Sequence, residues 1–245
     1  MPAATPTPDT EPTADTTGSG PGPTQSEPTQ RGEQTRLLII DTAIRLFREQ
    51  GYEKTTMRAI AQTAGLSVGN AYYYFPSKDH LVQEFYGRIQ AEHRSAAAPV
   101  LAITTGFADR LHAVMSTGIS AWGPYHGFGG RFFKVAADPQ SPLSPFSAES
   151  GPAREESLSL MRELVAGTTT KIDSELRDEL PELLWLLQLG VALFWVHDRS
   201  PGQARTRLLV DRAVPLIDRL VGLSRLRVLR PITHEALGLY RVLRP

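Results

Sequence analysis

Apolar residues in the segment 55–75 recur at helical spacing in two short runs with a turn between them. The first run predicts one buried helical face, because its apolar members fall three or four positions apart. These members are Met57, Ile60, Ala61 and Ala64. Thr55 and Thr56 supply hydroxyls that can cap the start of that helix, Gly65 stands where a left-handed residue would end it, and Ser67 can cap the next one. Two short helices joined by such a tight turn are typical of a helix-turn-helix.

The same periodicity continues on both sides of this segment. Residues 36–50 predict an amphipathic helix, because their apolar residues share one face. These residues are Leu37, Ile40, Ala43, Ile44 and Phe47. Gly51 ends this helix, and the hydroxyl of Ser77 can cap a further one. That further helix is expected to run to about Ala98, where Pro99 follows, and to be roughly 30 Å long.

Three motifs between residues 36 and 81 occur together and in a fixed order. They are G-Y-x-x-T-T, I-A-x-x-A-G-x-S and Y-x-x-F-x-S-K. Through them the segment resembles the DNA-binding head of the tetracycline-repressor (TetR) family, over about a fifth of the chain. Two positions depart from the family's usual pattern. Tyr74 stands where the family often has His, and Ala71 where it often has Leu or Ile.

The resemblance implies roles for nine residues of this head. Contacts to DNA phosphates are implied for Thr56, Tyr72, Tyr74 and Lys78, and contacts to base edges for Arg58, Val68, Gly69, Asn70 and Tyr73. Hydroxyl and ammonium groups suit phosphate oxygens, and a guanidinium can bridge guanine O6 and N7. Simpler explanations stay open: Tyr72 and Tyr73 could be core aromatics, and Arg58 and Lys78 could be plain surface charges.

Composition limits the classes of protein that fit. A chain of 245 residues with 41% hydrophobic content can bury a sizeable core, in one or two domains. The absence of cysteine excludes disulfides, a thiol nucleophile and thiolate metal sites, and it suits a cytoplasmic location. We expect no cofactor and no metal, because the histidines are scattered without a carboxylate at helical spacing. We expect no enzyme either, because no phosphate-binding loop, nucleophile elbow or carboxylate pair is recognisable.

Charge is polarised along a chain whose net charge is zero. Residues 1–30 contain four acidic residues and no Lys or Arg, whereas residues 199–245 contain ten Arg against three acidic residues. Rich in Pro, Thr and Gly and without an apolar run, residues 1–30 are expected to be a disordered tail and not a secretory signal. Either this acidic tail is inert, or it competes electrostatically with DNA for binding to the head.

Residues 81–224 are expected to form a ligand-binding and dimerisation domain similar to that of the family, followed by a C-terminal extension at 225–245. Helices are expected at 108–122, 155–170, 183–196 and 201–223, with Pro181 opening the third, and a loop at 138–152. The segment 183–196 is apolar nearly all round, but it is shorter than the ~20 residues that span a bilayer, so no membrane partner is expected. Together with 201–223 it is expected to form a four-helix bundle between two subunits. A purely intramolecular core is the alternative.

Aromatic residues of this second domain predict an apolar pocket with a few hydrogen-bonding groups. The candidate ligand-binding residues are Trp122, Tyr125, His126, Phe132, Phe133, Trp185 and Gln188, with Trp195 as a further wall residue. Core or interface packing of Trp185 and Trp195 and a partly exposed loop position for His126 remain open as alternatives.

These patterns predict an all-α protein with an N-terminal three-helix DNA-binding head at 31–80, which contains the helix-turn-helix, plus a C-terminal helical ligand-binding and dimerisation domain. The function they favour is that of a homodimeric repressor on a palindromic double-stranded DNA operator. A small apolar or aromatic effector would release it. Two alternatives stay open: a core that binds a protein partner instead of a small molecule, and an activator instead of a repressor.

Overall fold

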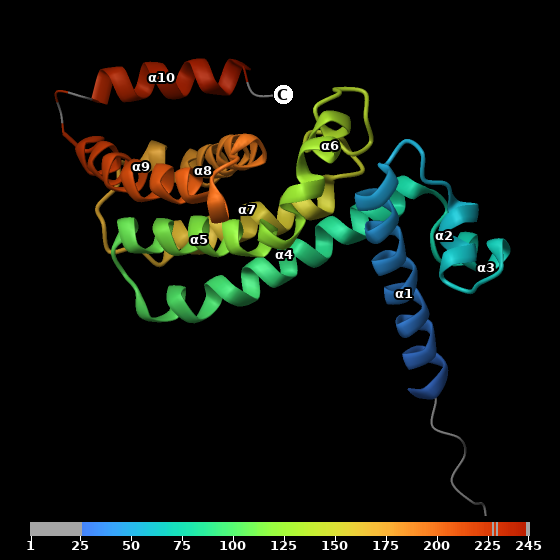
Figure 1. Cartoon of the computed structure of the whole chain (residues 1–245). Helices are drawn as coiled ribbons and strands as arrows, with labels where there is room; N and C mark the ends of the chain where they lie inside the picture. The colour runs from blue at the N-terminus through green and yellow to red at the C-terminus, as the bar shows by residue number, and fades with distance from the viewer. Residues whose placement is uncertain (1–25, 227, 229, 244–245) are drawn as a thin grey trace, which may run out of the picture.

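The structure is a computed structural model that describes residues 26–226, 228 and 230–243. All regular secondary structure in these residues is helical, which confirms the predicted all-α class. The elements are α1 Ser26–Gln50, α2 Met57–Thr63, α3 Val68–Tyr74, α4 Lys78–Ile103, α5 Phe107–Trp122, η1 Gly123–Tyr125, α6 His126–Ala136, α7 Gly151–Ala166, α8 Ser174–His197, η2 Pro201–Gln203, α9 Ala204–Leu223 and α10 Arg230–Leu243. Figure 1 shows α1, α2 and α3 gathered at one end of the long α4, with the later helices forming a separate body along the rest of it.

The head consists of α1, α2 and α3 closed by the first turns of α4. Its core contains the fully buried Phe47 of α1 and Ile60 of α2, together with Leu81 of α4. Ala71, the only residue of α3 that is buried, is 0% exposed. A methyl group there lets α3 lie close against its neighbours, which accounts for the small residue at this position.

The long helix α4 joins the head to the body. It continues through Pro99 to Ile103, so the predicted stop at Ala98 is wrong. A proline inside a helix leaves the carbonyl four residues earlier without its usual N–H donor. Ser95 is exposed, so its carbonyl can bond to water instead. With 26 residues α4 is about 39 Å long, and the predicted domain boundary after residue 80 falls within its first turn.

The first helix is longer than its apolar pattern predicts. α1 begins at Ser26 instead of Arg36, so residues 26–30 of the predicted tail are helical. The sequence of these added turns has no apolar periodicity, so the pattern does not predict them. Residues 1–25, to which the remaining tail predictions apply, lie outside the described residues.

Two helices form where proline or glycine suggests otherwise. Asp173 caps α8 by accepting hydrogen bonds from two backbone N–H groups of its first turn, so Pro181 lies inside the helix instead of opening it. α6 forms over His126–Ala136 although three glycines interrupt its sequence. Its Phe132 and Ala136 are buried in the head core, and burial of this kind offsets the entropy that glycine loses in a helix.

The body is built on a second buried cluster, formed by the later part of α4 with α5, α7, α8 and α9. Leu111, Val114, Met115 and Ile119 of α5 are all buried in this cluster. α7 begins and ends four residues earlier than predicted, and the loop before it ends at Ser150. The loop is not simply a surface connection, since its Leu143 is 0% exposed and packs into the head core.

α8 is long and apolar enough, at 24 residues, to cross a membrane by length and composition. It is also longer than the fourteen or so residues that the apolar run predicted. Six of its residues are buried within the protein, namely Leu180, Leu184, Trp185, Gln188, Val191 and Trp195. A central helix that packs on more than one side is apolar for that reason.

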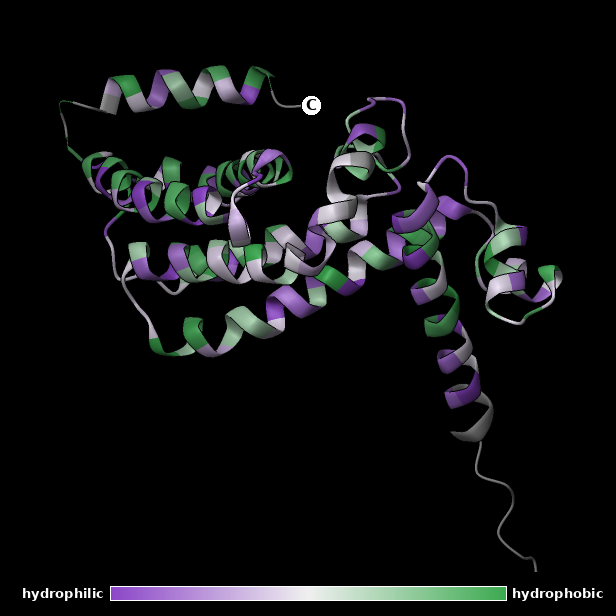
Figure 2. Cartoon of the chain, viewed as in Figure 1, coloured by the Kyte–Doolittle hydropathy of each residue, from purple (hydrophilic) through white to green (hydrophobic). Residues whose placement is uncertain are grey.

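The C-terminal extension contains α10, an amphipathic helix that packs against α8. Figure 2 shows hydrophobic and hydrophilic residues alternating along it. Leu237 is 4% exposed and faces the body. Ion pairs join the helices, among them His234 Nδ1 with Glu175 Oε2 at 2.8 Å and Arg241 Nε with Glu179 Oε1 at 2.7 Å. The extension therefore has a defined docking position on the body.

Candidate nucleic-acid interface and core cavity

Hydroxyl caps define the start of both short helices of the head. Thr56 accepts a hydrogen bond from a backbone N–H in the first turn of α2, and Ser67 does the same for α3, each at 3.1 Å. Between them Gly65 has φ +70°, the left-handed conformation that ends α2. These are the features that the sequence predicts for a helix-turn-helix.

The outer face of α3 presents polar groups and an aromatic ring to solvent. Tyr73 is 82% exposed and Tyr72 49% exposed, so neither is a core aromatic. Gly69 and Asn70 in the first turn of α3 are exposed as well, and so is Arg58 on α2. This arrangement suits a helix that enters the major groove, because small and polar groups at its leading end can approach base edges.

Val68 and Tyr74 lie at the edge of this outer face. Both are half-buried and pack against the head core. The ring of Tyr74 contacts that of Tyr73 edge-on, with centroids 5.2 Å apart. Its hydroxyl lies close to α1, 3.8 Å from where a Cβ on Gly32 would be. Packing therefore restricts how far these two side chains can reach outward.

Lys78 begins α4 and is anchored on Tyr52 of the head. Its Nζ donates to the backbone oxygen of Tyr52 at 2.9 Å and lies 4.3 Å from the centre of the Tyr52 ring. An ammonium group has three donors, so two remain available for a phosphate. Thr56 is exposed, and its hydroxyl can still donate while its oxygen caps α2.

A cavity of about 680 Å³ lies between α4, α6, α7 and α8. Small-molecule sites commonly measure ~300–1,000 Å³ and are mostly apolar. The aromatic residues of this wall are Phe85, Tyr86, Trp122, Tyr125, Phe132, Phe133, Phe146, Trp185 and Trp195. Within the described residues no cluster of His, Asp and Glu could hold a metal ion.

Most of the predicted ligand-binding residues line this cavity. They are Trp122, Tyr125, Phe132, Phe133 and Trp185, and the additional Trp195 lines it as well. His126 and Gln188 are not among the residues that line the cavity. His126 instead hydrogen-bonds the Trp195 backbone oxygen through Nε2 at 2.9 Å. Gln188 is 4% exposed on the buried face of α8.

Sequence reasoning missed several wall residues that come from α4 and α7. Among them are Tyr86 and Gln90 of α4 and Arg154 and Ser157 of α7. No local motif marks them, because they meet only when the two helices pack together. Burial raises the pKa of the Tyr86 phenol.

The cavity wall is continuous with the core of the head. Four buried residues belong to both, namely Phe85, Ile89, Phe132 and Ala136. Tyr125 of the wall meets Phe85 edge-on, with centroids 4.7 Å apart. Arg48 at the end of α1 donates to the Pro124 backbone oxygen at 3.0 Å, and its guanidinium carbon lies 5.0 Å from the centre of the Tyr125 ring. Both α1 and α4 therefore contact the wall directly.

Large apolar side chains are exposed on the neighbouring helices α8 and α9. They are Leu193, Phe194, Leu208, Leu209, Leu216, Leu220 and Leu223, which we call the α8–α9 face. The apolar residues of α9 are divided between two faces, because its Val214 and Val221 are buried while its leucines are exposed. Exposed apolar groups concentrated on two helices are typical of a protein-binding surface.

Two family models match the chain. The one described as "Bacterial regulatory proteins, tetR family" matches residues 39–85, which include α2 and α3. The one described as "Tetracyclin repressor-like, C-terminal domain" matches residues 110–239, more than half of the chain. The second match includes α6, α7 and α8 of the cavity wall.

Individual proteins show the same similarity. The HTH-type transcriptional repressor KstR of Mycolicibacterium smegmatis is 42% identical over 55 residues, 22% of this chain and 27% of the relative. The chain thus spans only about a quarter of that curated relative's length.

Two solved structures share the fold over nearly their whole length. The TetR transcriptional regulator from Nitrosomonas europaea has a TM-score of 0.57 at 17% identity, covering 75% of this chain and 97% of its own. The regulator FadR from Bacillus subtilis, solved in complex with stearoyl-CoA, has a TM-score of 0.58 at 15% identity, covering 73% and 97%. At such identities the likeness is one of fold.

Proposed function

Because the chain belongs to the TetR family of bacterial regulatory proteins, a class of transcriptional regulators and not of enzymes, we propose that it is a DNA-binding repressor. It acts in the cytoplasm as a homodimer on a palindromic operator, and a small apolar or aromatic effector in the core cavity releases it. The observation that carries this proposal is that Phe85 and Ile89 of α4 belong both to the cavity wall and to the head core.

DNA recognition is assigned to the outer face of α3 and to α2. The exposed Arg58, Asn70 and Tyr73 read base edges, with Gly69 allowing close approach and Val68 contributing at the rim. The phosphate contacts come from Thr56, Tyr72, Tyr74 and Lys78, which fix the register of the head on the duplex. The exposure of Tyr73 supports the first group, and the two unused donors of Lys78 support the second.

Dimerisation is assigned to the α8–α9 face, which pairs with the same face of a second copy. Burying its exposed leucines and Phe194 removes apolar surface from water on both subunits, which favours association. A two-fold dimer presents two α3 helices to two half-sites. These read a palindrome when they lie about 34–36 Å, or a multiple of that, apart along the duplex.

Effector release follows from the shared wall. A ligand that fills the cavity presses on Phe85 and Ile89, and any shift of these side chains moves α4 relative to the head core. If the effector binds more tightly to the conformation whose two heads have the wrong spacing, its binding lowers the affinity for DNA. DNA then lowers the affinity for the effector by the same factor. The structural neighbour FadR, solved with stearoyl-CoA, supports the view that this fold can hold a ligand with a long apolar chain.

The test is to select bound DNA from a random library and then screen apolar and aromatic compounds for release of the selected site. We expect a palindromic consensus and a protein of dimeric mass at micromolar concentration. A monomeric mass, or a selection without any enriched sequence, would overturn the proposal. Release by a protein partner with no response to any compound would reassign the core to protein binding.

A further inference from the structure

The amide, guanidinium and serine side chains of the wall are confined to one side of the cavity. α6 and α8 contribute only apolar and aromatic residues to the wall. The amide, guanidinium and serine hydroxyl groups come instead from α4, the 138–150 loop and α7, and they belong to Gln90, Ser144, Ser150, Arg154 and Ser157. A wall divided in this way suits a ligand that is itself divided into an apolar body and one polar head.

Arg154 is the one charged side chain among the described residues that line the cavity. It is half-buried, and its Nη1 donates to the backbone oxygens of Pro145 at 2.9 Å and Ser147 at 3.3 Å. These contacts hold the guanidinium against the loop. A guanidinium has five N–H donors, so others remain to bind a second group. Within the described part of the chain Arg154 forms no ion pair with a carboxylate.

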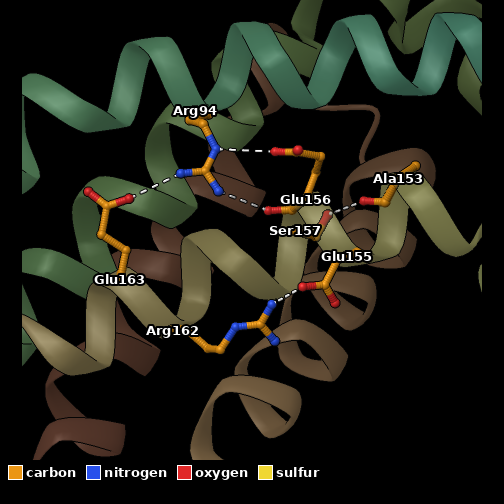
Figure 3. A network of polar contacts seen from close by, with 7 residues as sticks. All are labelled: Arg94, Ala153, Glu155, Glu156, Ser157, Arg162 and Glu163. Atoms are coloured by element: carbon orange, nitrogen blue, oxygen red, sulfur yellow. Dashed lines mark hydrogen bonds and ion pairs between the residues drawn. The ribbon is translucent and has the colours of Figure 1, made fainter.

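The acidic residues that neighbour Arg154 on α7 are engaged by other arginines. Figure 3 shows Arg94 of α4 reaching Glu156 and Glu163, and Arg162 reaching Glu155. The two contacts of Arg94 measure 3.3 Å and 3.1 Å. Because these carboxylates already have partners, they do not compete for the positive charge of Arg154. That charge is left to act on the contents of the cavity.

We propose that the cavity takes an amphipathic anion, whose apolar body lies between α6 and α8 and whose single carboxylate binds Arg154. This inference rests on the proposed effector function, because it names the chemical class of that effector. A carboxylate that meets a guanidinium in a partly buried site gains charge-assisted hydrogen bonds, often two in parallel. A neutral ligand with the same body lacks the attraction between opposite charges and the two parallel carboxylate acceptors.

Two probes that differ only in the head group test the idea, dodecanoate and 1-dodecanol. The three tryptophans of the chain are Trp122, Trp185 and Trp195, and all three line the cavity, so intrinsic fluorescence reports occupancy. The quantity of interest is the ratio of the two dissociation constants, 1-dodecanol over dodecanoate. In Arg154→Met we expect this ratio to fall about tenfold or more, because a charged hydrogen-bond partner is lost.

The ratio of the dissociation constants distinguishes binding of the carboxylate by Arg154 from support of the 138–150 loop by the same side chain. Loss of the Pro145 and Ser147 contacts would weaken both probes together and leave the ratio unchanged. Arg154→Lys keeps the charge and is expected to keep most of the preference. Arg177→Met is the matched control, since Arg177 also donates to two backbone oxygens, at 3.4 Å each, but does not line the cavity.

An unchanged ratio in Arg154→Met would overturn the proposal while leaving the effector function intact. Failure of both probes to change the fluorescence would overturn the proposal and the apolar-effector function together. Dodecanoate that binds through Arg154 without releasing operator DNA would support the ligand class and overturn the release mechanism.

Discussion

Arg48 at the end of α1 packs against Tyr125 of the cavity wall, with the guanidinium carbon 5.0 Å from the ring centre. It also donates to the backbone oxygen of Pro124, at 3.0 Å. This contact joins head and body at a point separate from α4. A change in the position of Tyr125 on ligand binding would therefore reach α1 directly.

Replacing Arg48 with Met should weaken the coupling between effector and DNA. An exposed cation–π contact contributes ~0.5–1 kcal/mol, so the factor by which effector lowers DNA affinity should fall about two- to fivefold. Fluorescence anisotropy of labelled operator, with and without saturating effector, measures this factor. Arg45→Met, an exposed arginine of the same helix, is the control. Equal factors for wild type and Arg48→Met would contradict the idea.

Base-reading and phosphate-binding residues should differ in what their removal does. Arg58→Ala and Tyr73→Ala should cost about 1–3 kcal/mol on the operator and little on unrelated sequences, because base contacts are lost. Dimerisation and ligand binding should persist in both variants. Competition binding with operator and scrambled duplexes measures the difference, and equal losses on both duplexes would argue against base reading.

Lys78→Ala should weaken binding to all sequences by a similar factor. The dependence of affinity on salt should also become less steep by about one unit, because one phosphate contact is lost. Since Lys78 also contacts Tyr52, a thermal melt of the variant must first show that the head stays folded. A sequence-selective loss in a folded variant would reassign Lys78 to base reading.

A buried arginine ties three helices of the body together. Arg110 of α5 is 3% exposed and donates to four backbone oxygens at or near the C-terminal ends of α4 and α7. These oxygens belong to Leu101 and Thr104, each at 2.6 Å, and to Glu163 and Leu164, each at 2.8 Å. Gly167 leaves room for this guanidinium, because a Cβ there would overlap it.

Gly167→Ala should therefore lower the free energy of unfolding by about 1–3 kcal/mol, as overpacking does elsewhere. The guanidinium could move away only by giving up its hydrogen bonds to the carbonyls. Gly222→Ala in α9 is the control, since a Cβ there meets nothing within 4 Å and alanine favours the helix by up to ~1 kcal/mol. Urea denaturation measures both, and destabilisation by the two variants alike would contradict the explanation.

Acidification should destabilise the body through His93. Its Nε2 bonds the Val114 backbone oxygen at 2.8 Å, and burial lowers the pKa of the imidazole in spite of that contact. The unfolded chain, with a histidine pKa near ~6.5, then takes up the proton first. The contribution of neutral His93 to the free energy of unfolding is thus present above a pH of ~6.5 and is lost as the pH falls below that value.

His93→Gln tests this, because glutamine keeps a donor and does not titrate. The free energy of unfolding of wild type should fall more between pH 7.5 and pH 5.5 than that of the variant. Other titrating groups are common to both proteins and cancel in the comparison. Parallel loss of stability in the two proteins would exclude His93 as the source.

The helix-turn-helix was predictable because its determinants are local. The caps Thr56 and Ser67 and the left-handed Gly65 act within a few residues of themselves, and the structure has each of them in its predicted role. Proline is also a local signal, yet Pro99 and Pro181 both lie inside helices. At Pro99 the helix can continue because Ser95 is exposed and its carbonyl can bond to water, and at Pro181 because the helix already begins at the cap Asp173. Neither feature can be read from the proline itself.

The cavity was predictable only on its aromatic side. Large aromatic residues such as Trp122 and Phe132 tend to gather wherever an apolar interior forms, so composition alone pointed to them. Arg154 and Gln90 look like ordinary surface residues, and only the packing of α7 against α4 brings them to one wall. His126 and Gln188 do not line the cavity for the converse reason, since a polar residue beside aromatics in sequence need not face the same space.

Because residues of the cavity wall also belong to the head core, they limit how the ligand specificity of such a protein can change. A substitution at Phe85 or Phe132 that reshaped the cavity for a new ligand would at the same time loosen the packing of the DNA-binding head. Leu186 and Leu189 line the cavity from α8 and lie outside the head core. New ligand specificities that preserve the operator should therefore arise first at these α8 positions.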